Sequence, residues 1–178
     1  ISADGKILGN AVLGLDQRGQ EYARQLEERI RADRLYAITG NVPGAFYSLT
    51  KLCWLRDNQP ELFHATWRFM PWSGLICSLL GGSSLCDYSL ASRTLLFDIG
   101  QERWSRELLR AADLPEEKLP KLAPAGTPLG TISAPLAREL GLPSNVRLVL
   151  GGHDQCCNAL GAGVTATGQA VYCLGSYL

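Results

Sequence analysis

The chain has 178 residues, 46% of them hydrophobic and 19% charged, and its 17 Lys and Arg residues balance its 17 Asp and Glu residues. A single domain that buries about 70% of the surface of its unfolded chain is expected at this length. The neutral balance gives no electrostatic footprint for a nucleic acid or an anionic membrane, and no run of about 18 apolar residues could span a bilayer. Since the N-terminus also lacks a charged-then-apolar signal pattern, a cytoplasmic globular protein is expected.

The first sixty residues predict a strand followed by helices. In chain order, the expected elements are a hairpin end at residues 1–6, a strand at 8–15, a helix at 18–31, a turn at 40–44 and a helix at 46–56. The pattern is clearest in the first helix, because Tyr22, Leu26 and Ile30 recur every four residues on one face while Glu and Arg occupy the other.

The middle of the chain is predicted to be mostly helical. The expected elements are a helix that starts after Pro60, is broken at Pro71 and ends at Gly81, and a second helix at residues 103–112. Tryptophans recur in this section at helical spacing. Trp54, Trp67 and Trp72 are therefore expected to pack in the core instead of stacking against a sugar.

The last third of the chain predicts strands that alternate with helices. The expected elements are a Pro- and Gly-rich connector at residues 123–130, a helix at 134–140, a strand at 146–150, a closely packed helix of small residues at 156–163 and a strand at 170–174. Such alternation indicates the α/β class.

Residues 151–155, Gly-Gly-His-Asp-Gln, form the corner between the strand at 146–150 and the helix of small residues, and they carry one carboxylate, Asp154. In open α/β sheets, ligands bind at such corners beyond the carboxyl ends of the strands, and glycine lets a substrate approach the backbone. Asp154 is expected at the helix N-cap, where a carboxylate also satisfies free backbone N–H groups. From the corner alone, Asp154 could equally be a structural helix cap or a residue with a chemical role.

Six cysteines lie in apolar segments without the spacing of a disulfide framework: Cys53, Cys77, Cys86, Cys156, Cys157 and Cys173. They are interpreted as packed thiols in a reducing compartment. No metal site on the protein is expected from them, because neither a Cys-x-x-Cys nor a His-x-x-x-His pattern is present. A thiol hydrolase that uses Cys156 beside His153 is an alternative, but sequence neighbours are seldom the spatial partners that a Cys–His pair requires.

Several motifs follow one another along the chain. The corner at residues 151–155 is followed by Ala-Leu-Gly-Ala-Gly at 159–163, and residues 87–98 read Asp-Tyr-Ser-Leu-Ala-Ser-Arg-Thr-Leu-Leu-Phe-Asp. Further matching segments are residues 51–55 with Pro60, residues 104–105 and residues 119–120. In these motifs and their order, the chain resembles the FGGY carbohydrate kinases, the family of glycerol kinase, xylulokinase and gluconokinase.

The resemblance implies an α/β fold, the actin-like ATPase (ribonuclease H-like) domain. Residues 1–178 would form part of the N-terminal domain, without the family's N-terminal Asp-x-Gly-Thr phosphate loop and without its C-terminal domain. The implied reaction transfers the γ-phosphoryl group of ATP, with Mg²⁺, to a hydroxyl group of a sugar or polyol. The 178 residues alone are expected to be inactive, because half of the phosphate-binding machinery is missing.

The resemblance also implies roles for single residues. Asp154 matches the general base, and Gln155 matches a neighbour that hydrogen-bonds a substrate hydroxyl. Tyr88 and Asp16 match substrate-binding positions. Tyr88 could equally be a half-buried packing residue, and Asp16 could pair with Arg18.

At the end of the chain, Gly175 and Ser176 match the family's Gly-Thr pair near the transferring phosphate, with an ordinary turn as the alternative. Gly14 stands where many members have Trp, which disfavours glycerol and leaves ketoses, sugar acids and longer polyols open. A xylulose-like ketose is favoured as the small-molecule partner, and a homodimer is compatible with the sequence. An actin-like-fold protein that serves binding or assembly, without sugar chemistry, is the alternative from another functional class.

Overall fold

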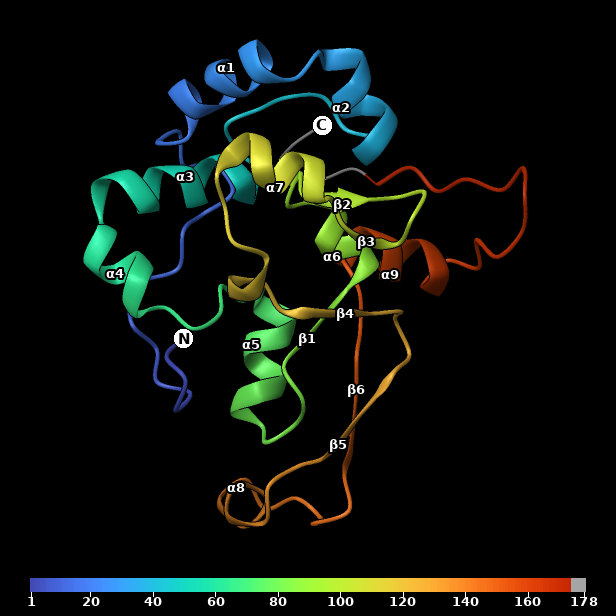
Figure 1. The fold of residues 1–178 in the computed structure, drawn as a ribbon. Coiled ribbons are helices and arrows are strands. Elements are labelled where there is room, and N and C mark those ends of the chain that lie inside the picture. The colour runs from blue at the N-terminus through green and yellow to red at the C-terminus, as the bar shows by residue number, and fades with distance from the viewer. Residues whose placement is uncertain (174–178) are drawn as a thin grey trace.

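The structure is a computed structural model that describes residues 1–173 (Figure 1). The helices are α1 (Gln20–Arg29), α2 (Ala32–Thr39), α3 (Ser48–Asn58), α4 (Pro60–Ala65), α5 (Trp72–Leu79), α6 (Tyr88–Ser92), α7 (Arg106–Ala112), a 3₁₀ helix at Glu116–Lys118, α8 (Ala134–Glu139) and α9 (Asp154–Gly161). The strands are β1 (Leu85–Asp87), β2 (Phe97–Asp98), β3 (Arg103–Trp104), β4 (Lys121–Ala123), β5 (Pro128–Thr131) and β6 (Arg147–Val149).

The strands of the described residues pair two by two. β1 and β4 are parallel, with Cys86 opposite Leu122, and the connection between them passes through α6 and α7. β2 pairs with β3, and β5 with β6, in antiparallel fashion. The register of the last pair shifts between Pro128 and Gly130, where the positive φ of Gly130 (108°) accommodates the irregularity.

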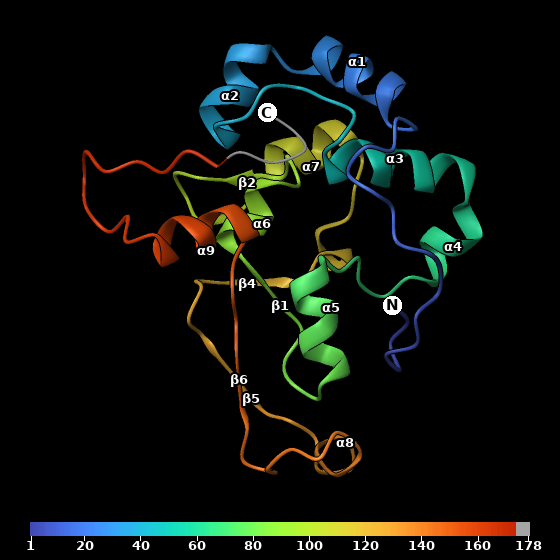
Figure 2. The ribbon, with the colours of Figure 1, turned by 180° about the vertical axis from the view of Figure 1, so that it is seen from behind.

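The main hydrophobic core joins helices α1, α2, α3, α6 and α7, and it includes the fully buried Leu35, Leu49 and Leu108. A smaller cluster lies at the β5–β6 pair, around Leu129 and Leu148. In Figure 1, β5, β6 and α8 extend away from the helical part of the molecule. The chain then returns through β6, so that α9 lies beside α6 in both views (Figure 2).

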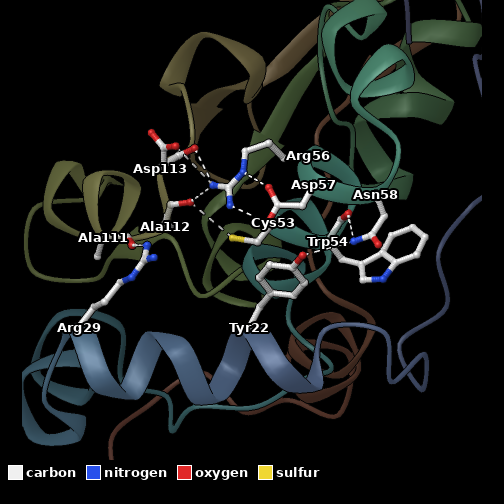
Figure 3. Close-up of polar contacts among 10 residues, drawn as sticks. All are labelled: Tyr22, Arg29, Cys53, Trp54, Arg56, Asp57, Asn58, Ala111, Ala112 and Asp113. Carbon is white, nitrogen blue, oxygen red and sulfur yellow. Dashed lines mark hydrogen bonds and ion pairs between the residues drawn. The ribbon is translucent and has the colours of Figure 1, made fainter.

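The C-terminus of α7 is bound by side chains from α1 and α3 (Figure 3). Arg56 donates from Nη1 to the carbonyl oxygens of Ala112 and Asp113, at 2.5 and 3.0 Å. Arg29 donates to the carbonyl oxygen of Ala111 at 2.8 Å. The last carbonyl groups of a helix lack partners within it, and a guanidinium also complements the negative end of the helix dipole. These contacts join three helices into one unit.

Most of the expected helices are confirmed. Those predicted at 18–31, 46–56 and 134–140 occur as α1, α3 and α8, and the strand predicted at 146–150 occurs as β6. The helix predicted at 103–112 starts later than expected. Residues 103 and 104 pair as β3 instead, and the side chain of Ser105 caps α7 by accepting a hydrogen bond from the Leu108 N–H.

The strand predicted at residues 8–15 is wrong. This segment has no regular structure, and its Leu13 and Leu15 side chains are 73% and 63% exposed. An extended segment becomes a strand only where a neighbour can accept its hydrogen bonds, and no strand of the described residues pairs with it. The strand predicted at 170–174 is likewise not formed over its described residues, 170–173.

Two tryptophans predicted for the core are on the surface. The residue exposures of Trp67 and Trp72 are 43% and 62%, whereas Trp54 is half-buried. The helix expected through this section ends at Ala65, so the spacing that would have placed Trp67 on a buried face does not apply. Its ring is covered by the guanidinium of Arg68, 4.5 Å from the ring centroid.

Candidate functional site

The predicted corner joins β6 to α9 and leaves the Asp154 carboxylate at the surface, with 82% of its side chain exposed. Asp154 is the first residue of the helix, and the N-cap is His153, so the predicted N-cap is wrong by one residue. The backbone N–H of Gln155 donates to Asp154 Oδ1 at 2.8 Å and to His153 Nδ1 at 3.3 Å. An acidic residue in the first turn of a helix is favoured by the helix dipole.

A second strand-to-helix corner, between β1 and α6, lies against the first one. Its Asp87 is fully buried and caps α6, with Oδ1 accepting hydrogen bonds from the Leu90 N–H at 3.0 Å and from the Ser89 hydroxyl. The same Ser89 oxygen accepts a hydrogen bond from the backbone N–H of His153 at 2.8 Å. One hydroxyl group thus joins the two corners, and it fixes the residue directly before Asp154.

The two glycines of the corner have different surroundings. A Cβ atom on Gly152 would lie 3.1 Å from Ser89 Oγ and 3.5 Å from Cys157 Sγ, whereas a Cβ on Gly151 would meet no atom within 4 Å. A side chain at residue 152 would therefore require Ser89 to shift, whereas glycine fits the close approach of the two corners. Gly151 leaves open space beside the backbone.

His153 supplies the second titratable group of the corner. Its Nδ1 lies 3.2 Å from Asp154 Oδ1, close enough for an ion pair when the imidazole is protonated. A carboxylate with this exposure can accept a proton from the hydroxyl group of a bound molecule, because the Gln155 N–H leaves acceptor positions on both oxygens free. The geometry of the corner thus suits proton transfer at a surface.

Gln155 and Tyr88 lie at the starts of the two helices that follow the corners. Gln155 is exposed in the first turn of α9, next to Asp154. Tyr88 opens α6 between Asp87 and Ser89, and its half-buried ring stacks on Phe97 at 5.3 Å. The packing of the ring agrees with the half-buried alternative.

Asp16 belongs to another part of the molecule. Its carboxylate pairs with Arg18, at 2.7 Å between Oδ2 and Nη2, and the hydrogen bond from that side chain lowers the pKa of Asp16. The expected pairing of the two residues is therefore formed. The Arg18 guanidinium lies 4.5 Å from the Trp54 ring centroid. Over residues 1–173, no hydrogen bond or ion pair links this loop to Asp154.

Lys51 holds the segment that leads into Asp16, a role that was not predicted from the sequence. The lysine residue is only 6% exposed, and its Nζ donates to the carbonyl oxygens of Leu13, Gly14 and Phe46 at 2.6, 3.1 and 3.1 Å. Desolvation lowers the pKa of Lys51. A buried cation bound to backbone carbonyls fixes a loop that has no secondary structure of its own.

The six cysteines differ in exposure, with Cys77 and Cys173 intermediate. Cys53 and Cys86 are buried, and burial raises the pKa of these thiols to about 11 and about 12. Cys156 and Cys157 are exposed on α9, which has no buried residue, so the prediction of closely packed thiols is wrong there. Among the described residues, His153 makes no hydrogen bond to Cys156, so the geometry gives no Cys–His pair.

Gly175 and Ser176 lie outside the described residues. Within residues 1–173, no cluster of three or more His, Cys, Asp or Glu side chains has the arrangement of a metal site. In the same part of the chain, every helix is too short or too polar to cross a membrane.

Residues 1–161 match the family model described as the FGGY family of carbohydrate kinases, N-terminal domain. L-fuculokinase of Escherichia coli (strain K12) is 35% identical over 138 residues, which cover 78% of this chain and 29% of that protein. Xylulose kinase of Bacillus subtilis (strain 168) is 27% identical over 176 residues, 99% of this chain and 35% of that protein. The crystal structure of xylulose kinase from Rhodospirillum rubrum matches with a TM-score of 0.87 at 25% identity, over 94% of this chain and 34% of that one.

The chain therefore spans about a third of the length of these relatives. The expected fold class, a partial actin-like ATPase domain of the α/β class, is confirmed by the match in structure.

Proposed function

Because the chain belongs to the FGGY family of carbohydrate kinases, we propose that it is part of the N-terminal domain of an ATP-dependent kinase. The acceptor is a hydroxyl group of a sugar or polyol, with a xylulose-like ketose favoured. The chain by itself is inactive, since it spans only a third of relatives named as sugar kinases. In this proposal the intact enzyme acts on the sugar or polyol in the cytoplasm. It could do so as a homodimer.

The observation that carries the proposal is the exposed carboxylate of Asp154 at the end of a strand, beside a glycine with open space around it. In phosphoryl transfer the enzyme does little covalent chemistry, and positioning and electrostatics account for most of the acceleration. The acceptor hydroxyl must lose its proton as its oxygen bonds to phosphorus. Asp154 is the general base that accepts this proton.

Other side chains bind the acceptor. Gln155 follows the base and can both donate and accept hydrogen bonds, as recognition of a polyol requires. Tyr88 presents its phenol from α6 beside the corner. Asp16 would reach the substrate from its loop, with Arg18 holding its carboxylate ionised and Lys51 holding the backbone.

ATP and Mg²⁺ enter through the family assignment. Mg²⁺ is commonly held by one or two carboxylates together with the phosphates of the nucleotide, and it then neutralises charge on the phosphate oxygens. Gly175 and Ser176 are the residues of this chain proposed to lie beside the phosphates.

The experiment is a measurement of ADP release by a protein of the relatives' length that contains this chain. Ketoses, alditols and aldonates are added one at a time, and the products are identified by mass spectrometry. The proposal predicts ADP release that depends on one class of sugar and yields a sugar phosphate. ATP hydrolysis that no sugar stimulates, accompanied by filament assembly, would instead support the actin-like assembly protein.

A further inference from the structure

The two strand-to-helix corners are 64 residues apart in sequence, and the hydroxyl group of Ser89 joins them. We propose that Asp87 and Ser89 are positioning residues that hold the Asp154 carboxylate in place for proton transfer. This inference rests on the proposed function, because it assigns these two residues a part in the reaction that Asp154 performs.

The direction of each hydrogen bond follows from the chemistry of the groups. The backbone N–H of His153 can only donate, so Ser89 Oγ accepts at 2.8 Å. The hydroxyl proton of Ser89 is then directed to Asp87 Oδ1, which also receives the Leu90 N–H at 3.0 Å. Asp87 is fully buried and cannot turn towards water. Its carboxylate therefore sets the orientation in which the hydroxyl presents a lone pair to the His153 N–H.

Apart from its Oδ1 contacts with the Ser89 hydroxyl and the Leu90 N–H, the Asp87 carboxylate has no partner among the described residues. Its second oxygen, Oδ2, is buried and has no hydrogen-bond partner there. A buried carboxylate oxygen without a donor costs free energy, so a side chain that served packing alone would be more stable without the charge. A charged acceptor, however, forms a shorter and stronger hydrogen bond than a neutral amide. The carboxylate of Asp87 thus orients the Ser89 hydroxyl firmly, although its Oδ2 is left without a donor.

The helix that begins with Asp154 depends on this anchor. None of the residues of α9 is buried, so hydrophobic packing does little to fix its position. The anchor acts at His153, directly before the base, and the 3.1 Å approach of a Gly152 Cβ position to Ser89 Oγ shows how closely the corners meet. Loss of the hydroxyl would free the first turn of α9, and a displacement of about 1 Å can cost about 10²-fold in rate.

The first test measures the steady-state kinetics of a protein that contains this chain and has the length of its kinase relatives. Ser89→Ala is expected to lower kcat at least about 10-fold with little change in the KM of the sugar, and Ser89→Thr, which keeps the hydroxyl, is expected to restore most of kcat. Ser105→Ala is the matched control. It also removes a serine oxygen that accepts from a backbone N–H, at the cap of α7, and it should leave kcat unchanged.

A double variant shows whether the serine acts through the base. In an Asp154→Asn background, Ser89→Ala is expected to cause no further loss of kcat, because residues that act as a unit are not additive. Equal losses in both backgrounds would overturn the inference, and so would an unchanged kcat of Ser89→Ala beside a strongly reduced kcat of Asp154→Asn. If Asp154→Asn itself kept full activity, the proposed function would fail as well.

Hydrogen exchange tests the contact without activity. The backbone amide of His153 is expected to exchange faster in Ser89→Ala than in the wild type and in Ser105→Ala, because its only acceptor among the described residues is gone. Equal protection of this amide in all three proteins would overturn the anchor, whatever the kinetics show.

Discussion

At the residue scale, the corner depends on which of its two glycines is replaced. Gly152→Ala places a methyl group 3.1 Å from Ser89 Oγ, and it is expected to lower the free energy of unfolding by about 1 kcal/mol or more by overpacking. The methyl group of Gly151→Ala meets no atom within 4 Å, so this variant is expected to change the free energy of unfolding by less than about 0.5 kcal/mol. Urea unfolding of both variants checks the difference. Equal stabilities would mean that the two corners do not touch as described.

Thiol reactivity should follow exposure. Cys156 and Cys157 are expected to be alkylated within minutes at pH 8, whereas Cys53 and Cys86 should react only after unfolding, because burial raises their pKa to about 11 and about 12. Peptide mass spectrometry after timed iodoacetamide treatment measures the order. Rapid labelling of Cys86 in the folded protein would contradict its position in the core.

The sequence predicted the corner that carries Asp154 but not the contact that supports it. The place of Asp154 between a strand and a helix could be predicted because its motif is local and continuous. The role of Ser89 could not, since the contact that gives it meaning joins residues 64 positions apart. The Asp-x-Ser pattern at residues 87–89 was the available signal, and it is typical of a helix cap without indicating a partner. The pairing of Asp16 with Arg18 was predictable, because it lies within one loop.

At the element scale, the joint of α1, α3 and α7 should carry measurable stability. Arg56→Met removes the donor to the Ala112 and Asp113 carbonyl groups, and it is expected to lower the free energy of unfolding by about 1–3 kcal/mol. Arg31→Met is the matched control, since the Arg31 side chain is 85% exposed and, within residues 1–173, pairs only with the exposed Asp33. Urea unfolding measures both. If Arg56→Met lowered the free energy of unfolding no more than Arg31→Met does, the joint in Figure 3 would contribute little to stability.

Helices were predicted better than strands for a physical reason. The periodicity of α1 and α3 is contained in ten or eleven successive residues, whereas a strand exists only if a distant segment accepts its hydrogen bonds. Residues 8–15 have the composition of a strand and no partner, and residues 103–104 form one because they meet β2. The exposed Trp72 shows that helix prediction is limited in the same way. Helical spacing predicts which residues share a face of the helix, but not whether another element covers that face.

At the scale of the whole molecule, stability should fall at alkaline pH. The pKa of Cys86 is raised from 9.0 to about 12 on folding, so above pH 9 the unfolded chain releases a proton that the folded chain retains. The stabilisation is complete below pH 9 and is lost as the pH rises towards 12. Between pH 8.5 and 10.5 the wild type should lose about 2 kcal/mol more than Cys86→Ala. Parallel pH profiles of the two proteins would contradict this assignment.

Asp154→Asn provides the most direct measurement of the central claim, made on the protein of the relatives' length. Asp113→Asn is the control, because Asp113 is also an exposed carboxylate and asparagine tolerates its positive φ of 53°. We expect Asp154→Asn to lower kcat for sugar phosphorylation about 10²- to 10⁴-fold without changing the thermal unfolding temperature. Asp113→Asn is expected to keep the wild-type kcat. An Asp154→Asn enzyme with undiminished kcat would contradict the account, because the acceptor proton would then leave without this carboxylate.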